Sequence, residues 1–377
     1  NHALRLLPLP LGEGRGEGLG LEPAPPQRQD HGMTDASPWG SRPVADQTID
    51  SRVAEYLRRQ GMDRLATRVA RLHGDASNRC YVRLTPRDGP SMVLAVHPEP
   101  FATDALPEIT VGALFEQLAI PVPAVVGQAG DLGILALEDL GDQTLQNWLT
   151  VPGGDPTRLY REAVGLIAKL QQDGAGLRAE AALPFTLAFD TSKLTWELAF
   201  FQSEFLLAYR HVALAPAAAE ALREEFSTIA EELAAEPRVL CHRDYHSRNL
   251  MVHRNRLVVI DFQDARMGPA TYDLVSLLRD CYVDLSPDLV TATTEHFLDA
   301  VPTERTADFG RRCDLMSVQR HLKALGTFGH QIAIIGQPGF AAYVPRTIAY
   351  LRRTLHAYPR FGRLLELLAP YLPTLVS

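Results

Sequence analysis

The chain has 377 residues, of which 46% are hydrophobic and 22% charged, so it can bury a substantial core in one large globular unit or in two lobes. Its formal net charge of −8 argues against a general affinity for nucleic acid or anionic membranes. No apolar run reaches the roughly 18 residues of a membrane span, and the four cysteines lack C-x-x-C spacing, which favours reduced thiols and a cytoplasmic location.

The N-terminal stretch, residues 1–47, differs from everything that follows. It is rich in Gly and Pro and shows almost no hydrophobic periodicity. It also lacks the basic start and long apolar core of a secretory signal. We expect a disordered or non-native extension, with Met33 as the possible true start, while a functional disordered tail stays open as an alternative.

Residues 48–138 carry the pattern of a small β-rich lobe. Apolar spacing predicts a helix over 50–60, with Asp50 or Ser51 as its N-cap. Period-two runs then predict strands at 65–72, 80–84 and 92–96. The small residues 74–78 predict a hairpin tip whose backbone N–H groups could cover nucleotide phosphates, although such a tip can also be an ordinary turn.

The chain then changes from strands to helices. A helix is predicted over 106–118, and Pro121 and Pro123 mark its end. Strands at 124–127 and 133–137 lead into the acidic segment 138–142. Later amphipathic patterns predict helices at 159–172, 194–212, 217–235, 272–282, 287–301, 309–328 and 344–358.

One polar constellation stands inside the helical half, between Val239 and Asp264. The apolar runs 250–252 and 257–260 flank a polar turn, which is the pattern of a β-hairpin. Antiparallel pairing brings Asn249 and Asp261 to the same end of that hairpin. Their amide and carboxylate oxygens suit Mg²⁺, and Asp244 enters the hairpin five residues before Asn249. The set contains a base and two metal ligands but no covalent nucleophile.

This segment resembles the catalytic loop and metal-binding Asp of the protein-kinase-like superfamily, in the variant of aminoglycoside and choline phosphotransferases. The resemblance implies an α+β, bilobal protein-kinase-like fold, with lobes 48–138 and 139–377, that uses ATP and Mg²⁺. It makes Asp244 the catalytic Asp, Asn249 and Asp261 the metal ligands, and His242 the strut of the loop. Asp273 is implied to brace that loop. Gln263 replaces the usual Gly after the metal Asp.

Two other interpretations of these residues stay open. His242 and His246 are four residues apart and could form a zinc pair, although a metal-binding helix does not fit between two strands. Asp244 and Asp261 could also be ordinary turn residues.

The nucleotide site departs from the superfamily in one respect. The strand 91–97 lacks the usual phosphate-binding Lys, and Arg79 or Arg83 are the nearest replacements because an Arg forms a bidentate fork for phosphate. The segment 138–142 resembles the hinge that reads adenine, with an acidic turn as the alternative. The candidate ATP contacts are Ser77, Asn78, Arg79, Arg83, Glu116, Glu138 and Leu140.

A closer resemblance covers residues 50–370. The segments 74–79, 137–142, 189–198, 273–282 and 319–326 are similar to the anomeric amino-sugar kinases of bacterial cell-wall recycling. These enzymes phosphorylate the 1-hydroxyl of N-acetylmuramate and N-acetylglucosamine, which implies a small sugar as the partner. Candidate acceptor contacts are His246, Asp264, Arg279, Arg320, His321 and Lys323. The last four could recognise an anionic group such as the lactyl carboxylate of N-acetylmuramate, or they could be ordinary cations on helix surfaces.

Three rival functions remain. A kinase of aminoglycosides or other amino alcohols would use the same catalytic residues but should line its acceptor site with carboxylates. A protein kinase is disfavoured because the A-P-E anchor is missing after Asp261. A non-catalytic nucleotide-binding pseudokinase scaffold would explain the missing Lys but not the intact Asp244, Asn249 and Asp261. A monomer is the favoured state.

Overall fold

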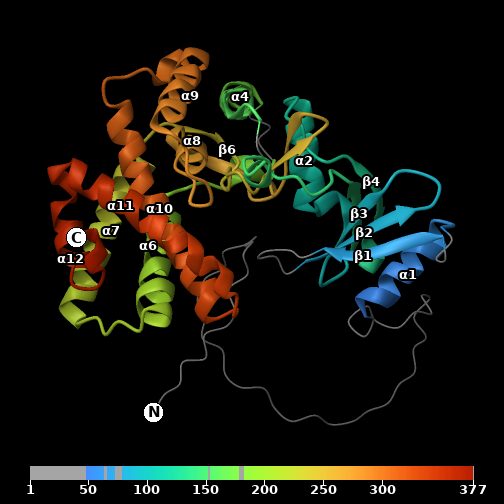
Figure 1. Cartoon of the computed structure of the whole chain (residues 1–377), viewed down its shortest axis with the longest axis horizontal. Helices are drawn as coiled ribbons and strands as arrows, with labels where there is room; N and C mark the ends of the chain where they lie inside the picture. The colour runs from blue at the N-terminus through green and yellow to red at the C-terminus, as the bar shows by residue number, and fades with distance from the viewer. Residues whose placement is uncertain (1–47, 63–65, 73–78, 152, 178–181, 377) are drawn as a thin grey trace, which may run out of the picture. The chain divides into compact units, whose positions relative to one another are not determined.

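The computed structural model of the chain describes residues 48–62, 66–72, 79–151, 153–177 and 182–376. They form two compact units (Figure 1). The first contains the described residues up to Ala105 together with Ala124–Asp139, and the second contains Leu106–Pro123 and the residues from Leu140 onward. Within these ranges, no helix combines the length and the apolar character needed to cross a membrane.

The first unit is a five-stranded antiparallel sheet with the strand order β1-β2-β3-β5-β4. Helix α1 accompanies the sheet in Figure 1. The elements are α1 (Ile49–Arg59), β1 (Thr67–Leu72), β2 (Cys80–Pro86), β3 (Met92–Val96), η2 (Thr103–Ala105), β4 (Val125–Ala129), η3 (Gly130–Leu132) and β5 (Ile134–Glu138). The predicted strands are therefore confirmed to within a few residues.

Side-chain alternation explains the two faces of this sheet. Val82 and Leu84 on β2 are buried in a core shared with α1, so Arg83 between them points to the opposite face. Helix α1 contributes its apolar stripe to that core. Its N-cap is Thr48, whose hydroxyl accepts the N–H of Ser51 at 3.2 Å, so the predicted cap was placed two or three residues too late.

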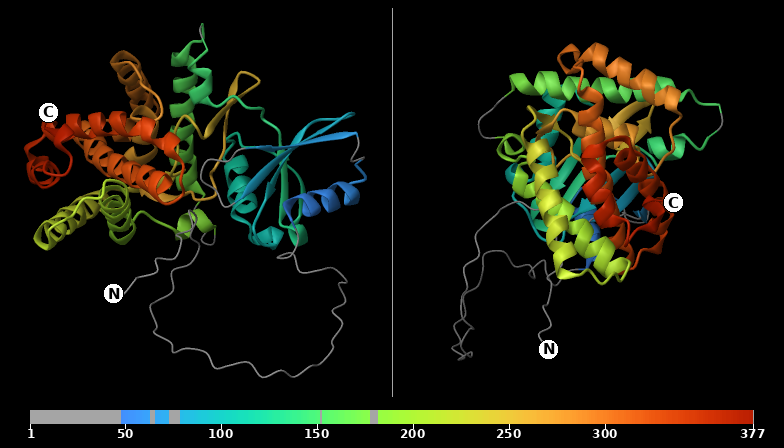
Figure 2. Two further views of the ribbon diagram at one scale, coloured as in Figure 1. Left: turned by 60° about the horizontal axis from the view of Figure 1, so that its bottom comes forward. Right: turned by 90° about the vertical axis from the view of Figure 1, so that its left-hand side faces the viewer.

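The second unit is mostly helical. Its helices are α2 (Pro107–Gln117), α3 (Leu145–Trp148), α4 (Pro156–Gly176), α5 (Leu183–Thr186), α6 (Thr191–Phe200), η4 (Phe201–Tyr209), α7 (Pro216–Ala234), α8 (Thr271–Leu278), α9 (Pro287–Ala300), η5 (Pro302–Glu304), α10 (Phe309–Ala333), η6 (Pro338–Tyr343), α11 (Val344–Ala357), η7 (Pro359–Phe361), α12 (Gly362–Leu368) and η8 (Pro373–Leu375). Figure 2 shows α10, in orange-red, alongside α11.

Helix α2 belongs to this second unit, although the sequence placed residues 106–118 in the small lobe. Its Phe115 packs on Phe262 with ring centroids 5.4 Å apart. The N–H of Val259 also donates to the carbonyl of Pro121 at 2.8 Å, just beyond the helix. Both contacts join α2 and its following turn to the hairpin region of the second unit, and they explain the assignment.

Helix α6 continues directly into the π-helix η4, where the sequence predicted a single α-helix over 194–212. Helix α10 approaches η4 so closely that only Gly fits at two contact points. A Cβ at Gly329 would lie 2.5 Å from the carbonyl oxygen of Glu204, and one at Gly326 would lie 2.9 Å from the nitrogen of Phe201. The position of α10 is therefore set by backbone-to-backbone packing.

Two short antiparallel ribbons complete the second unit. Strands β7 (Leu250–His253) and β8 (Arg256–Val259) form the predicted hairpin. Its turn is only two residues long, Arg254 and Asn255, with φ of +47° and +63°, as in the tight hairpin turns that match strand twist. Strands β6 (Arg238–Cys241) and β9 (Arg266–Pro269) form a second ribbon that the sequence patterns did not predict.

Candidate active site

The loop between β6 and β7, residues 242–249, is built around a buried histidine. The ring of His242 is fully buried, and its Nε2 lies 3.0 Å from the carbonyl oxygen of Ile260. Its Nδ1 accepts the N–H of Asp244 at 3.3 Å, so Nε2 carries the proton. Both nitrogens therefore have protein partners. The described residues contain no cluster of three His, Cys, Asp or Glu suited to a metal, so the zinc interpretation finds no support.

Two buried carboxylates hold the two ends of this loop. Asp273 on α8 accepts the N–H groups of His242 at 2.6 Å and Arg243 at 3.0 Å. It thereby fixes Arg243 at φ +90°, a conformation that is strained for a residue with a side chain. At the other end, Asp280 accepts the N–H of Ser247 at 2.8 Å. The backbone around Asp244 is thus pre-organised from both sides.

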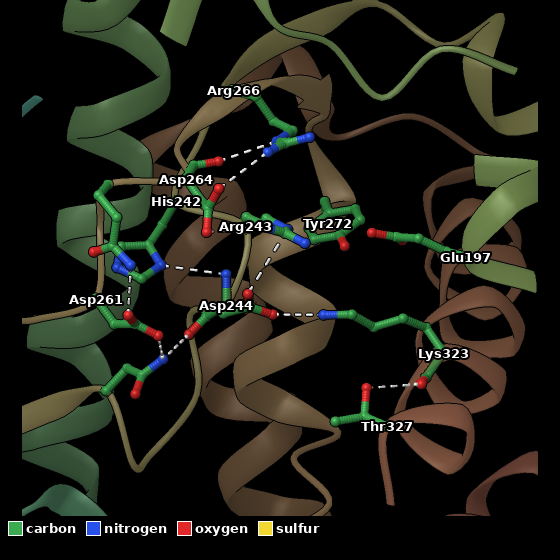
Figure 3. Close-up of polar contacts among 12 residues, drawn as sticks. Glu197, His242, Arg243, Asp244, Asp261, Asp264, Arg266, Tyr272, Lys323 and Thr327 are labelled. Carbon is green, nitrogen blue, oxygen red and sulfur yellow. Dashed lines mark hydrogen bonds and ion pairs between the residues drawn. The ribbon is translucent and has the colours of Figure 1, made fainter. Parts of the chain in front are cut away.

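Asp244 itself lies among three cations, two of which, Arg243 and Lys323, are labelled in Figure 3. Its Oδ1 is 2.7 Å from Nζ of Lys323 and 3.6 Å from the guanidinium of Arg320, and its Oδ2 is 3.8 Å from Nε of Arg243. Burial alone would raise the pKa of Asp244, but the attraction of these three cations outweighs it and holds that pKa well below its usual value. The carboxyl group is therefore ionised, and 24% of its side chain remains exposed.

Two of the three cations are also bound elsewhere. Arg243 pairs with Asp264 at 3.0 Å, and Asp264 also receives Arg266 at 3.4 Å, so Asp264 is enclosed by two guanidinium groups. Arg320 donates to the hydroxyl of Tyr272 at 2.7 Å. These bonds keep Arg243 and Arg320 in place beside Asp244.

Asn249 and Asp261 meet, as the hairpin predicted. The Nδ2 of Asn249 donates to the carbonyl of Asp244 at 2.9 Å and to Oδ2 of Asp261 at 3.3 Å. The Oδ1 of Asp261 accepts from Gln263 at 2.8 Å. Both bonds of Asn249 use its NH2 group and not its amide oxygen. One amide and one carboxylate fit Mg²⁺, which takes few protein ligands and completes its shell with phosphate and water oxygens.

Asp261 also shows backbone strain, with φ of +63°. A left-handed conformation is uncommon for a residue other than Gly and concentrates at functional sites. It turns the chain sharply at the end of β8, and this turn directs the carboxylate toward Asn249.

The remaining candidate acceptor residues divide into two groups. His246 lies near Asp244, with its ring edge against Tyr282 at 5.0 Å, and burial lowers its pKa to about 3, so the ring is neutral. Arg279 instead pairs with Asp314 at 2.5 Å. His321 stacks on a tyrosine of α11 and contacts the carbonyl of Arg279 at 3.1 Å. The structure therefore brings His246, Arg320 and Lys323 to Asp244, but not Arg279 or His321.

Lys323 and Arg320 are largely buried, with side chains 15% and 10% exposed. They are therefore not the ordinary helix-surface cations that the sequence left open as an alternative.

The candidate nucleotide contacts belong mainly to the first unit. Ser77 and Asn78 lie outside the described residues. Arg83 forms an ion pair of 2.9 Å with Asp139, and Arg79 directly precedes β2. One of the boundaries between the units falls between Asp139 and Leu140, within the segment predicted as a hinge.

Three further ATP candidates can be located. The N–H of Glu138 donates to the carbonyl of Ala124 at 2.8 Å, and the carbonyl of Leu140 lies 3.1 Å from Nδ1 of His253. Glu116 is exposed on α2, in the second unit. The contacts of these residues with a nucleotide stay predictions.

Several residues of the site escaped sequence reasoning. Arg243 stands between His242 and Asp244 in the sequence, so its position could have drawn attention. Asp280 and Tyr272 lie within or beside the family-like segment 273–282, but nothing in the pattern marked their bonds to the loop and to Arg320. Glu197 is buried and accepts from Gln319 at 2.8 Å across α6 and α10, a pairing with no sequence signal.

Known proteins resemble the chain over most of its length. Residues 68–309 match the model of the phosphotransferase enzyme family. The chain is 32% identical to an N-acetylmuramate/N-acetylglucosamine kinase of Neisseria meningitidis serogroup B, over 78% of this chain and 87% of that protein. It is 34% identical to a protein of the same name from Pseudomonas aeruginosa, over 78% of this chain and 86% of that protein.

A solved structure supports the fold. The choline kinase of Cryptosporidium parvum superposes with a TM-score of 0.56 at 12% identity, over 86% of this chain and 99% of that one. The predicted α+β, protein-kinase-like fold is thereby confirmed. From the family model, the two relatives and the fold together, we conclude that this chain belongs to the phosphotransferase enzyme family.

Proposed function

We propose that this phosphotransferase transfers the γ-phosphoryl group of ATP to the anomeric 1-hydroxyl of N-acetylmuramate and N-acetylglucosamine. The observation that carries the proposal is the ionised Asp244 set among Lys323, Arg320 and Arg243. This set offers a base for an alcohol and a positive environment for anionic reactants. The names of the two relatives with 32% and 34% identity favour the same acceptors.

In the proposed reaction, Asp244 orients the sugar hydroxyl and takes its proton through Oδ2. The sugar oxygen forms its bond to the γ-phosphorus while the bond between that phosphorus and the oxygen of ADP breaks, so no covalent enzyme intermediate is needed. Mg²⁺ held by Asn249 and Asp261 would neutralise charge on the phosphates. An anomeric hydroxyl is a relatively acidic alcohol, so a carboxylate suffices as its base.

A cationic acceptor is the rival for the same reaction. Aminoglycosides and amino alcohols carry positive charge. To reach Asp244 they would have to come close to the three cations that surround it. Like charges at such separations are unfavourable, the more so because the site is partly buried. This charge pattern favours a neutral or anionic sugar over an aminoglycoside.

The second rival is a pseudokinase scaffold without activity. A scaffold has no need to keep its base and metal ligands in mutual contact. Here Asn249 donates to both Asp244 and Asp261, and Asp273 keeps the loop in a strained conformation. Strain held in place by buried hydrogen bonds is typical of active sites. It therefore favours a catalytic role for this chain over a scaffold role.

The test is ADP release with Mg²⁺-ATP and three acceptors: N-acetylmuramate, N-acetylglucosamine and a cationic aminoglycoside. We expect turnover with both amino sugars and none with the aminoglycoside. Asp244→Asn is the matched control, because it keeps the shape of the side chain and removes the base. Turnover with the aminoglycoside alone would contradict the acceptor assignment, and nucleotide binding without turnover would favour the scaffold.

A cytoplasmic location completes the proposal. The four thiols Cys80, Cys241, Cys281 and Cys313 form no disulfide, as a reducing compartment requires.

A further inference from the structure

We infer that Lys323 is a positioning residue for Asp244: it holds Oδ1 of the base and leaves Oδ2 to receive the proton of whichever amino sugar is bound. The inference rests on the proposed function. It gives Lys323 a role other than recognition of a carboxylate on the acceptor, which the sequence had suggested. The two roles predict different kinetics, so an experiment can separate them.

The first support is geometric. The Nζ of Lys323 donates to Oδ1 of Asp244 at 2.7 Å, a short charge-assisted hydrogen bond (Figure 3). The other two cations approach the same carboxylate only to 3.6 Å and 3.8 Å. Lys323 is therefore the group that fixes the orientation of the carboxylate.

The second support is the division of bonds among the cations. Arg243 is committed to Asp264, and Arg320 to Tyr272. The hydrogen bond of Lys323 is made to Asp244, and a carboxylate on the sugar would compete with Oδ1 for its charge at the moment when the base must be oriented. A lysine that stays on Asp244 serves an acceptor with a carboxylate and one without it equally well.

The third support is the packing that brings Lys323 to the site. Gly326 and Gly329, one and two turns further along α10, lie in direct contact with the backbone of η4. This packing leaves α10 little freedom to slide. Burial lowers the pKa of Lys323 below its usual value, while Asp244 and the buried Glu197 on α6 act against this shift and favour the ammonium form.

The experiment measures kcat and KM of Lys323→Met and Lys323→Arg with N-acetylmuramate and with N-acetylglucosamine. For Lys323→Met we expect kcat to fall by the same factor for both acceptors, about 10- to 100-fold, the scale of one charge-assisted hydrogen bond. KM for either sugar should change little. Lys323→Arg should recover part of the lost kcat, because it restores the charge.

Lys169 supplies the matched control. It forms an ion pair of the same length, 2.7 Å, with Asp173 on the exposed face of α4. Lys169→Met should change neither kcat nor KM. Should Lys323→Met fail to fold, Lys323→Gln takes its place with the same expected loss.

The outcomes separate the inference from the proposed function. A wild-type protein that phosphorylates neither sugar would refute the proposed function itself. With an active wild type, a rise in KM confined to N-acetylmuramate would show that Lys323 reads the carboxylate, and unchanged kcat for both sugars would show that it does not position the base. Either result overturns the inference and leaves the kinase assignment standing.

Discussion

Replacing Gly329 by Ala tests the packing that carries the cations of α10 to the catalytic loop. A Cβ at this position would meet the carbonyl oxygen of Glu204 at 2.5 Å and the Cα of Phe205 at 2.7 Å. Both are backbone atoms of the π-helix η4, so no side chain can rotate aside to make room. Helix α10 or η4 must therefore move. Any movement of α10 carries Lys323 with it.

The expected magnitude follows from two opposing terms. Overpacking against backbone costs about 2–3 kcal/mol, while Ala in place of Gly inside a helix returns about 1 kcal/mol. Gly329→Ala should therefore lower the free energy of unfolding by about 1–2 kcal/mol. Gly165→Ala is the matched control, because Gly165 lies inside α4 and a Cβ added there would have no heavy atom within 4 Å, so it should raise the free energy by about 0.5–1 kcal/mol.

The assay is urea unfolding of the two variants and the wild type, followed by kcat at saturating substrates. Gly329→Ala should shift the midpoint to lower urea and reduce kcat several-fold, because Lys323 no longer meets Asp244 at its present distance. Gly165→Ala should shift the midpoint the other way and leave kcat unchanged. If both variants proved more stable than the wild type, the close packing of α10 on η4 would not exist as described.

The remaining predictions concern the catalytic loop and the nucleotide. Asp244→Asn should leave ATP binding intact and lower kcat by about 10²–10⁴-fold, the usual contribution of a positioned base, as measured by ADP release. Asp261→Ala should abolish the effect of Mg²⁺ on nucleotide binding, which a thermal-shift titration with and without Mg²⁺ would reveal. If Arg79 replaces the missing Lys, Arg79→Ala should raise KM for ATP by about 10-fold or more. Arg83→Ala should raise KM and also destabilise the fold, because it removes an ion-pair partner of the largely buried Asp139 side chain.

The sequence predicted the elements whose periodicity is strong. The runs at 92–96 and 287–301 correspond to β3 and α9 almost residue for residue. The hairpin of β7 and β8 also placed Asn249 beside Asp261, since antiparallel pairing is a local constraint that a short pattern fully expresses.

Long-range pairing was less accessible. Strands β6 and β9 are four residues each and lie more than twenty residues apart, so neither carries enough alternation to be distinguished from a loop. The π-helix η4 has the same apolar residues as an α-helix and differs only in its hydrogen bonds. It packs against α10, a long-range contact that no local pattern encodes.

The site residues show the same difference between local patterns, which the sequence reveals, and long-range contacts, which it does not. Asp244, Asn249 and Asp261 share one motif and could be assigned together. Lys323 comes from a helix 79 residues further along the chain, so its charge was visible but its contact with Asp244 was not. The bonds of Asp280 likewise depend on how the end of α8 meets the loop.

The central claim, that the acceptor atom is the anomeric oxygen of an amino sugar, is tested most directly by phosphorus NMR of the product formed from N-acetylmuramate and Mg²⁺-ATP. We predict a single sugar phosphate whose phosphorus couples to the proton at C1 of the sugar. A phosphomonoester at C6, coupled to the two protons of that carbon, would contradict the claim, and so would an amino sugar that remains unphosphorylated while an aminoglycoside is consumed.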